Sequence, residues 1–170
     1  MTPNQEFDLK PLNASAVQTA LEKAMRYRLL NEPAQAESIC LDILALEPDN
    51  SEAIHTMLLA LTDRSGTLYS VGNIEMKDLV DRLASDYERF YFKGIILERE
   101  GQAYLRESKW GGKYEAFEKL TEAMDWYEKA EKVRPEHNDD AILRWNTCVR
   151  IIQYNGLEAR PPDDAEHFLE

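Results

Sequence analysis

The chain is 170 residues long, which suits one domain with a core of ordinary size. It carries 32 Asp and Glu against 20 Lys and Arg, a formal net charge of −12, so neither nucleic-acid phosphates nor an anionic membrane surface is an expected partner. Hydrophobic residues make up 44% of the chain, which excludes a disordered protein.

The cysteines and the hydropathy pattern predict the cellular compartment of the protein. Cys40 and Cys148 lie far apart, each inside an apolar helical pattern, which favours a reducing compartment. No apolar stretch approaches the length of a membrane span, and residues 1–12 lack the apolar segment of a signal peptide. We therefore expect a cytoplasmic protein.

Apolar residues recur at helical spacing from the first element onward, and no segment shows the alternation of a strand. A first helix is predicted from Ser15, which has capping-box spacing to Gln18. Pro33 is expected in the first turn of a second helix that stops near Pro48. A third helix follows, and residues 63–73 are predicted to form a loop because they are rich in Gly, Ser and Asn.

The second half of the chain predicts longer helices. A short helix over 74–84 is followed by a second capping box, Ser85 with Glu88, which begins the longest helix, to about Glu107. A Gly-rich turn around Trp110 leads into further helices at 114–133 and 138–154.

Two segments share one spacing of small, apolar and proline residues, which indicates an internal repeat. The first set is Ala36, Cys40, Ile43 and Pro48, and the second is Ala123, Tyr127, Ala130 and Pro135. Together with Ala20, Ala24 and Tyr27 upstream, these residues resemble the tetratricopeptide repeat (TPR), a helix-turn-helix unit.

The resemblance implies an all-α, right-handed superhelix of TPR-like repeats. Residues 15–155 would form the repeat domain, between an extended or disordered N-terminus at 1–14 and a flexible tail at 156–170. The repeats would occupy 17–50, 51–86 and 87–135, followed by a capping helix at 138–154.

The third repeat departs from the family pattern in length. The interval from Pro48 to Pro135 leaves it about 17 residues longer than a standard unit, and the extra residues surround Trp110. We therefore predict an elongated hairpin. Trp110 at its tip either folds back onto the hairpin or serves as a contact with another molecule.

The family binds peptides or partner helices in a concave groove, and its register implies which residues line the groove here. They are Leu21, Met25, Arg28, His55, Leu59, Tyr91, Ile95, Arg99 and Arg144. Such a surface suits an apolar peptide with acidic flanks. Alternatively, Leu21, Met25 and Leu59 belong partly to the core and the arginines are ordinary surface charges. The Lys and Asn residues of the family's carboxylate clamp are missing, so chaperone C-termini are not expected partners.

No motif predicts catalysis, a cofactor or a metal. His55, His137 and His167 are far apart and have no ligand spacing. The acidic segment Asp163–His167 is typical of a solvated tail, and Gly111–Tyr114 lacks the remaining residues of a phosphate loop.

We therefore expect a non-enzymatic scaffold that binds a protein segment. The alternatives are a homo-oligomer, such as a dimer, formed through the long hairpin or the capping helix, and a secretion-type chaperone, whose hairpins are of ordinary length. A catalytic or small-molecule site in the concave face is a further alternative.

Overall fold

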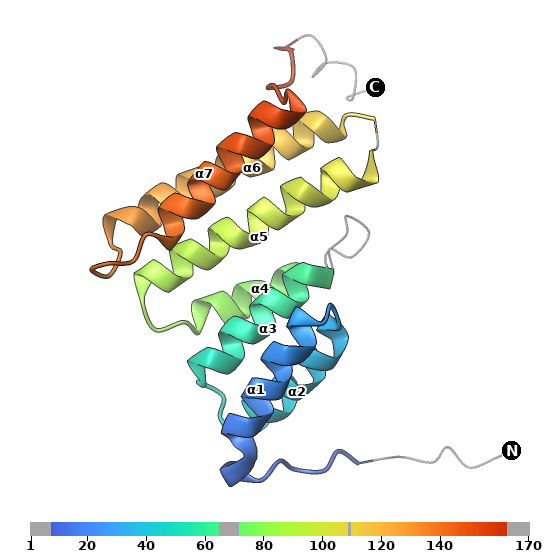
Figure 1. The fold of residues 1–170 in the computed structure, drawn as a ribbon, viewed down its shortest axis with the longest axis vertical. Coiled ribbons are helices and arrows are strands. Elements are labelled where there is room, and N and C mark those ends of the chain that lie inside the picture. Colours follow the sequence, from blue (N-terminus) through green and yellow to red (C-terminus); the bar gives the residue numbers. More distant parts are fainter. Residues whose placement is uncertain (1–7, 65–71, 109, 163–170) are drawn as a thin grey trace, which may run out of the picture. The chain divides into compact units, whose positions relative to one another are not determined.

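Helices account for the regular structure of the chain in the computed structural model, which describes residues 8–64, 72–108 and 110–162. No strand occurs within those ranges, which confirms the all-α prediction. The elements in chain order are η1 (Ala14–Ala16), α1 (Val17–Leu29), α2 (Pro33–Leu46), α3 (Ser51–Arg64), α4 (Gly72–Asp81), α5 (Asp86–Glu107), α6 (Gly112–Lys132) and α7 (Asp140–Asn155) (Figure 1). None of the described helices has the length and apolar character that crossing a bilayer requires.

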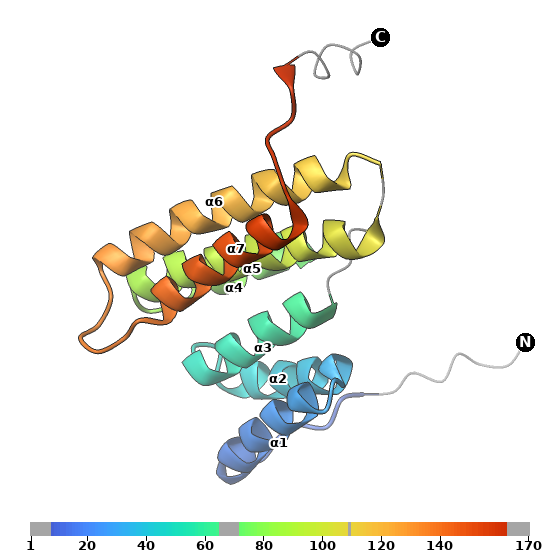
Figure 2. The ribbon, with the colours of Figure 1, turned by 45° about the horizontal axis from the view of Figure 1, so that its top comes forward.

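The chain divides into two compact units, Met1–Ala60 (unit 1) and Leu61–Glu170 (unit 2). Helix α3 begins in unit 1, and its last turn belongs to unit 2. In unit 1, α1 packs against α2. In unit 2, α5, α6 and α7 pack against one another, with α6 antiparallel to both α5 and α7, and α4 contacts α5 (Figure 2).

The start of α1 differs from the prediction. Ser15 lies inside η1 and does not cap the helix. Instead, the Asn13 side chain accepts a hydrogen bond from the Ser15 backbone N–H at 3.0 Å, because Asn takes the extended backbone that precedes a helix as readily as Ser does. The predicted position of Pro33 is confirmed, since it occupies the first turn of α2.

Unit 1 has a small core made by α1, α2 and the first turns of α3. Val17, Leu21, Ile43 and Ala53 form its buried cluster. Ala24 packs without exposed surface, as expected for a small residue where two helices cross closely.

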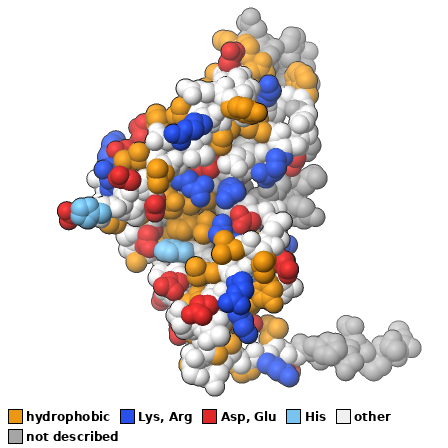
Figure 3. Space-filling model, viewed as in Figure 1, with side chains coloured by type: hydrophobic (Ala, Val, Ile, Leu, Met, Phe, Trp, Pro, Cys, Tyr) orange, Lys and Arg blue, Asp and Glu red, His pale blue; other side chains and the backbone are white. Residues whose placement is uncertain are grey.

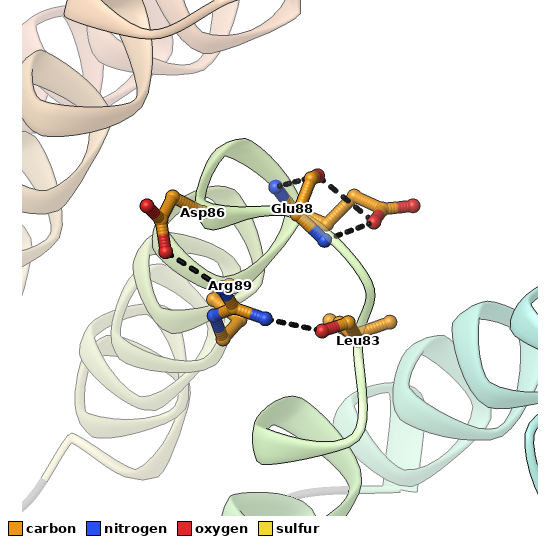
Figure 4. A network of polar contacts seen from close by, with 5 residues as sticks. Leu83, Asp86, Glu88 and Arg89 are labelled. Atoms are coloured by element: carbon orange, nitrogen blue, oxygen red, sulfur yellow. Dashed lines mark hydrogen bonds and ion pairs between the residues drawn. The ribbon is translucent and has the colours of Figure 1, made fainter.

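The start of α5 follows the prediction closely. The Ser85 hydroxyl accepts from the Glu88 backbone N–H at 3.1 Å, and the Glu88 carboxylate accepts from the Ser85 N–H at 3.1 Å. Arg89 reaches back from the first turn to the Leu83 carbonyl oxygen and to the Asp86 carboxylate, the latter at 2.6 Å (Figure 4). These contacts fix the connection from α4 to α5.

The hairpin of α5 and α6 is long, as predicted. These helices have 22 and 21 residues, compared with 13 and 14 in α1 and α2. The helices approach closely at Gly94, where a Cβ atom would lie 2.7 Å from Tyr127 Cδ1, nearer than packed atoms tolerate. The described part of the turn ends at Gly111, whose φ of 78° favours glycine.

The segment after α7 packs against the helices of unit 2 over part of its length, whereas the sequence predicts a flexible tail from residue 156. Gly156 ends α7 in the left-handed region, and Leu157 is 5% exposed. The Arg160 guanidinium pairs with Glu115 at 2.8 Å and lies over the Tyr114 ring. Arg160 therefore ties this segment to the start of α6, whereas 163–170 lie outside the described residues.

The two sets of repeat positions have matching environments. Ala36, Cys40 and Ile43 on α2 have no exposed surface. The same holds for Ala123, Tyr127 and Ala130 on α6. Shared spacing thus corresponds to shared burial in α2 and α6.

Candidate polypeptide-binding surfaces

The predicted groove residues of unit 1 differ in exposure. Leu21 is 3% exposed and belongs to the core, so its assignment to a binding surface was wrong. Met25 is 54% exposed, and Leu29, one turn later on the same side of α1, is 81% exposed. Arg28, His55 and Leu59 are half-buried. Met25 is therefore the most exposed apolar member of this set.

The predicted groove residues of unit 2 are mostly engaged within the unit. Ile95 is 1% exposed, so it also belongs to the core and not to a binding surface. Arg99 Nη2 lies 3.7 Å from Asp63 Oδ1, and Arg144 Nη1 lies 3.2 Å from Glu98 Oε1. Both arginines thus have carboxylates of their own chain beside them. The sequence predicted them either as groove residues or as ordinary surface charges, and neither alternative included these ion pairs.

Glu98 is the centre of a buried polar cluster that joins α5, α6 and α7. Its side chain is 1% exposed. The carboxylate accepts hydrogen bonds from Tyr127 Oη at 2.6 Å, Gln102 Nε2 at 3.0 Å and Arg144 Nη1 at 3.2 Å. A buried carboxylate with several donors and a cation is stable where an isolated one would not be.

The protonation states in this cluster resist change. Burial raises the pKa of Tyr127, and the neighbouring Glu98 carboxylate raises it further. The same two causes raise the pKa of Cys148 to about 12. Burial acts to lower the pKa of Arg144, but Glu98 and Tyr91 raise it by more. Tyr127, Cys148 and Arg144 therefore keep their protons at neutral pH, which suits a structural role better than acid–base catalysis.

The described residues offer no obvious site for a metal. Within residues 8–64, 72–108 and 110–162, no group of at least three His, Cys, Asp or Glu side chains is placed to hold an ion. His137 is exposed beside Glu136, whereas Asp163–His167 lie outside the described residues. Gly112 begins α6, and the Lys113 side chain donates to the Asn155 carbonyl oxygen at the end of α7 at 3.4 Å.

A small apolar pocket lies between α4, α5 and α6 of unit 2, and we call it the Trp126 pocket. Its volume is about 160 Å³. Its lining consists of Met76, Lys77, Val80, Lys93, Ile96, Leu97 and Trp126. The 3.6-residue helical repeat puts positions 93, 96 and 97 on the opposite side of α5 from Tyr91, Ile95 and Glu98. The pocket is therefore distinct from the buried polar cluster.

Lysines surround the aromatic wall of the Trp126 pocket. Lys129 Nζ lies 3.9 Å and Lys93 Nζ 4.6 Å from the centre of the Trp126 ring. Lys77 of α4 is exposed at the opposite wall. Among the residues that the structure describes, no ion pair joins Lys77, Lys93 or Lys129 to a carboxylate.

Sequence reasoning missed this pocket, although one signal was present. Residues 90–97 carry apolar side chains on nearly every side of α5, whereas a helix with a single neighbour needs them on one side. Ile96 and Leu97 are apolar residues beyond that one side, and they remain half-buried at the pocket. Nothing in the local sequence indicates that Trp126 of α6 would join them.

The tip of the α5–α6 hairpin presents a different surface. Trp110 is 83% exposed, so the hairpin leaves most of its surface open to solvent. A hollow of about 610 Å³ nearby is lined by residues of α5, α6 and the end of α7, including Tyr104, Tyr114 and Asn155. Figure 3 shows Lys and Arg side chains among hydrophobic ones on the visible face of unit 2.

The chain matches no family model, and comparisons with curated proteins and with solved structures find no similar chain.

Proposed function

We propose that the protein is a non-enzymatic interaction module with TPR-like architecture, which binds a segment of another protein in the Trp126 pocket. One observation carries this proposal: an apolar pocket open to solvent lies between three helices, and lysines without a carboxylate partner in the described part of the chain surround it. Apolar pockets with a few polar groups at the edge are typical binding sites.

The Trp126 pocket supports the proposal better than the predicted groove does. In the groove, Leu21 and Ile95 are buried and Arg144 lies against Glu98. Reversing the charge of Arg144 would therefore damage the fold and could not report on binding alone. Ile96 and Leu97 of the pocket are half-buried, so their side chains can be changed with less effect on the core.

The proposal includes the repeat arrangement and the compartment. Helix pairs joined by short turns, and the matching burial of α2 and α6, support a TPR-like stack. Cys40 and Cys148 are buried free thiols, which suit the reducing cytoplasm.

A peptide selection tests the function without knowledge of the natural partner. Random peptides displayed on phage are selected against the intact chain and, in parallel, against Leu97→Trp, in which the larger side chain fills the pocket. We expect peptides that bind the wild-type chain saturably and lose binding to Leu97→Trp.

Leu143→Trp is the matched control, because Leu143 is 62% exposed on α7 of the same unit and does not line the pocket. Peptides selected on the wild type should bind this variant unchanged. If no selected peptide distinguishes Leu97→Trp from Leu143→Trp, the proposed function is wrong.

Self-association is a second candidate function, and the exposure of Trp110 favours it. A large aromatic side chain at the end of a hairpin can anchor a contact between two copies. Light scattering would then detect a dimer of the wild type and a monomer of Trp110→Ser. A wild-type monomer at high protein concentration would contradict this candidate.

A further inference from the structure

We infer that the segment bound in the Trp126 pocket has one apolar anchor side chain with carboxylates beside it. This inference rests on the proposed function and adds the chemistry of the partner. It follows from the size of the pocket, the nature of its lining and the charges that surround it.

The pocket is sized for a side chain. Its volume of about 160 Å³ is below the roughly 300 Å³ at which sites for small organic ligands begin. Met76 and Val80 of α4 and Ile96 and Leu97 of α5 supply aliphatic surface, which attracts an apolar group by excluding water. A Leu, Met or Phe side chain of a partner meets these conditions.

The positive charges are held at the pocket by the residue that forms its wall. Lys93 and Lys129 both lie against the Trp126 ring, so the aromatic face already interacts with two cations. A cationic partner would have to displace one of them and would be repelled by the other. The ring therefore disfavours a basic segment and favours an acidic one.

The lysines at the Trp126 pocket have no carboxylate partner within the described part of the chain. Acidic residues exceed basic ones by 32 to 20 in the whole chain, yet the pocket lining contains lysines and no acidic residue. Lys119 of the same helix α6 shows the usual arrangement, since its Nζ lies 3.0 Å from Glu100. Lys77, Lys93 and Lys129 have no such pair in the described structure, so a partner's carboxylates would find cations free to bind.

The selected peptides provide the test. We expect Asp and Glu to be enriched on both sides of a conserved apolar position in peptides that bind the wild type and not Leu97→Trp. Binding is then measured by fluorescence in a Trp110→Phe/Trp145→Phe background, where Trp126 is the remaining tryptophan and should change its emission when the anchor is seated.

Charge reversal makes the test specific. Lys77→Glu/Lys93→Glu should weaken the selected peptides about tenfold or more, because attraction becomes repulsion. Lys10→Glu/Lys23→Glu changes the net charge equally at exposed positions of unit 1 and should weaken binding less than about twofold, through the long-range field alone.

The outcomes separate the inference from the function. Pocket-dependent peptides without acidic enrichment, or with equal affinity for both double variants, would overturn the inference and leave the proposed function standing. A selection that yields no pocket-dependent peptide would overturn the function itself. Acidic enrichment together with a loss confined to Lys77→Glu/Lys93→Glu supports both.

Discussion

The ion pair of Glu98 and Arg144 offers the sharpest test of how unit 2 is held together. Replacing Arg144 by Met removes the cation but keeps an unbranched side chain of similar length. The Glu98 carboxylate, 1% exposed, would keep its hydrogen bonds from Tyr127 and Gln102 but lose the nearby positive charge. Replacing Glu98 by Gln removes the negative charge with little change of shape.

The expected magnitude follows from burial. Removing one partner of a fully buried pair costs about 3–5 kcal/mol. Because the Arg144 side chain is 29% exposed, water screens part of the interaction, and we expect Arg144→Met to lower the free energy of unfolding by about 2–3 kcal/mol. Glu98→Gln should cost about 1–2 kcal/mol, since the freed guanidinium can turn toward solvent.

Urea unfolding followed by far-ultraviolet circular dichroism measures both values and the double variant. If the groups interact as described, the double variant loses about 1–2 kcal/mol less than the sum of the single changes. Additive losses would show that the two side chains are not coupled. A loss below about 0.5 kcal/mol for Arg144→Met would refute a buried, interacting Glu98.

Three further changes test the packing, a helix cap and the buried thiols. Gly94→Ala should lower the free energy of unfolding by about 2 kcal/mol, because the added methyl group meets the buried Tyr127 ring; an unchanged urea midpoint would show that α5 and α6 are less close there. Ser85→Ala removes the side-chain cap of α5 and should cost about 1 kcal/mol, with hydrogen exchange accelerated mainly in the first turn; uniform exchange would argue against the cap. Burial raises the pKa of Cys40 to about 11, and burial together with Glu98 raises that of Cys148 to about 12, from 9.0. The folded chain therefore keeps both protons where the unfolded chain loses them, so stability should fall as pH rises above about 9, and Cys40→Ala/Cys148→Ala should flatten the part of the fall between about pH 9 and 10, before the buried tyrosines Tyr87 and Tyr127 contribute in the same way. An equally steep fall in the double variant would mean that other groups cause it.

Local rules explain why the helices could be predicted from the sequence. Pro33 in a first turn and Ser85 with Glu88 are signals that act within one helical turn, and the structure confirms them. The same rules failed at Ser15, where Asn13 could cap as well and a short 3₁₀ turn over Ala14–Ala16 precedes α1. Local signals therefore predict the first residue of a helix well where a single residue can cap it, and less well where two nearby residues can.

The sites could not be predicted in the same way, because their partners are distant in the sequence. Glu98 begins the charged stretch Glu98–Glu100, which is typical of a solvated position, yet its partners Tyr127 and Arg144 come from α6 and α7. The Trp126 pocket likewise joins three helices. The predicted groove residues differ in solvent exposure: Met25 is exposed, whereas Ile95 is buried.

The central claim is that a partner's side chain enters the pocket beside Trp126, and methyl NMR spectra of the intact chain during titration with a selected peptide test it most directly. We expect saturable chemical-shift changes of the Met76, Val80, Ile96 and Leu97 methyl signals, while the methyl signal of Met25 in unit 1 does not shift. Shifts centred on Met25, or shifts that grow without saturating, would contradict the claim.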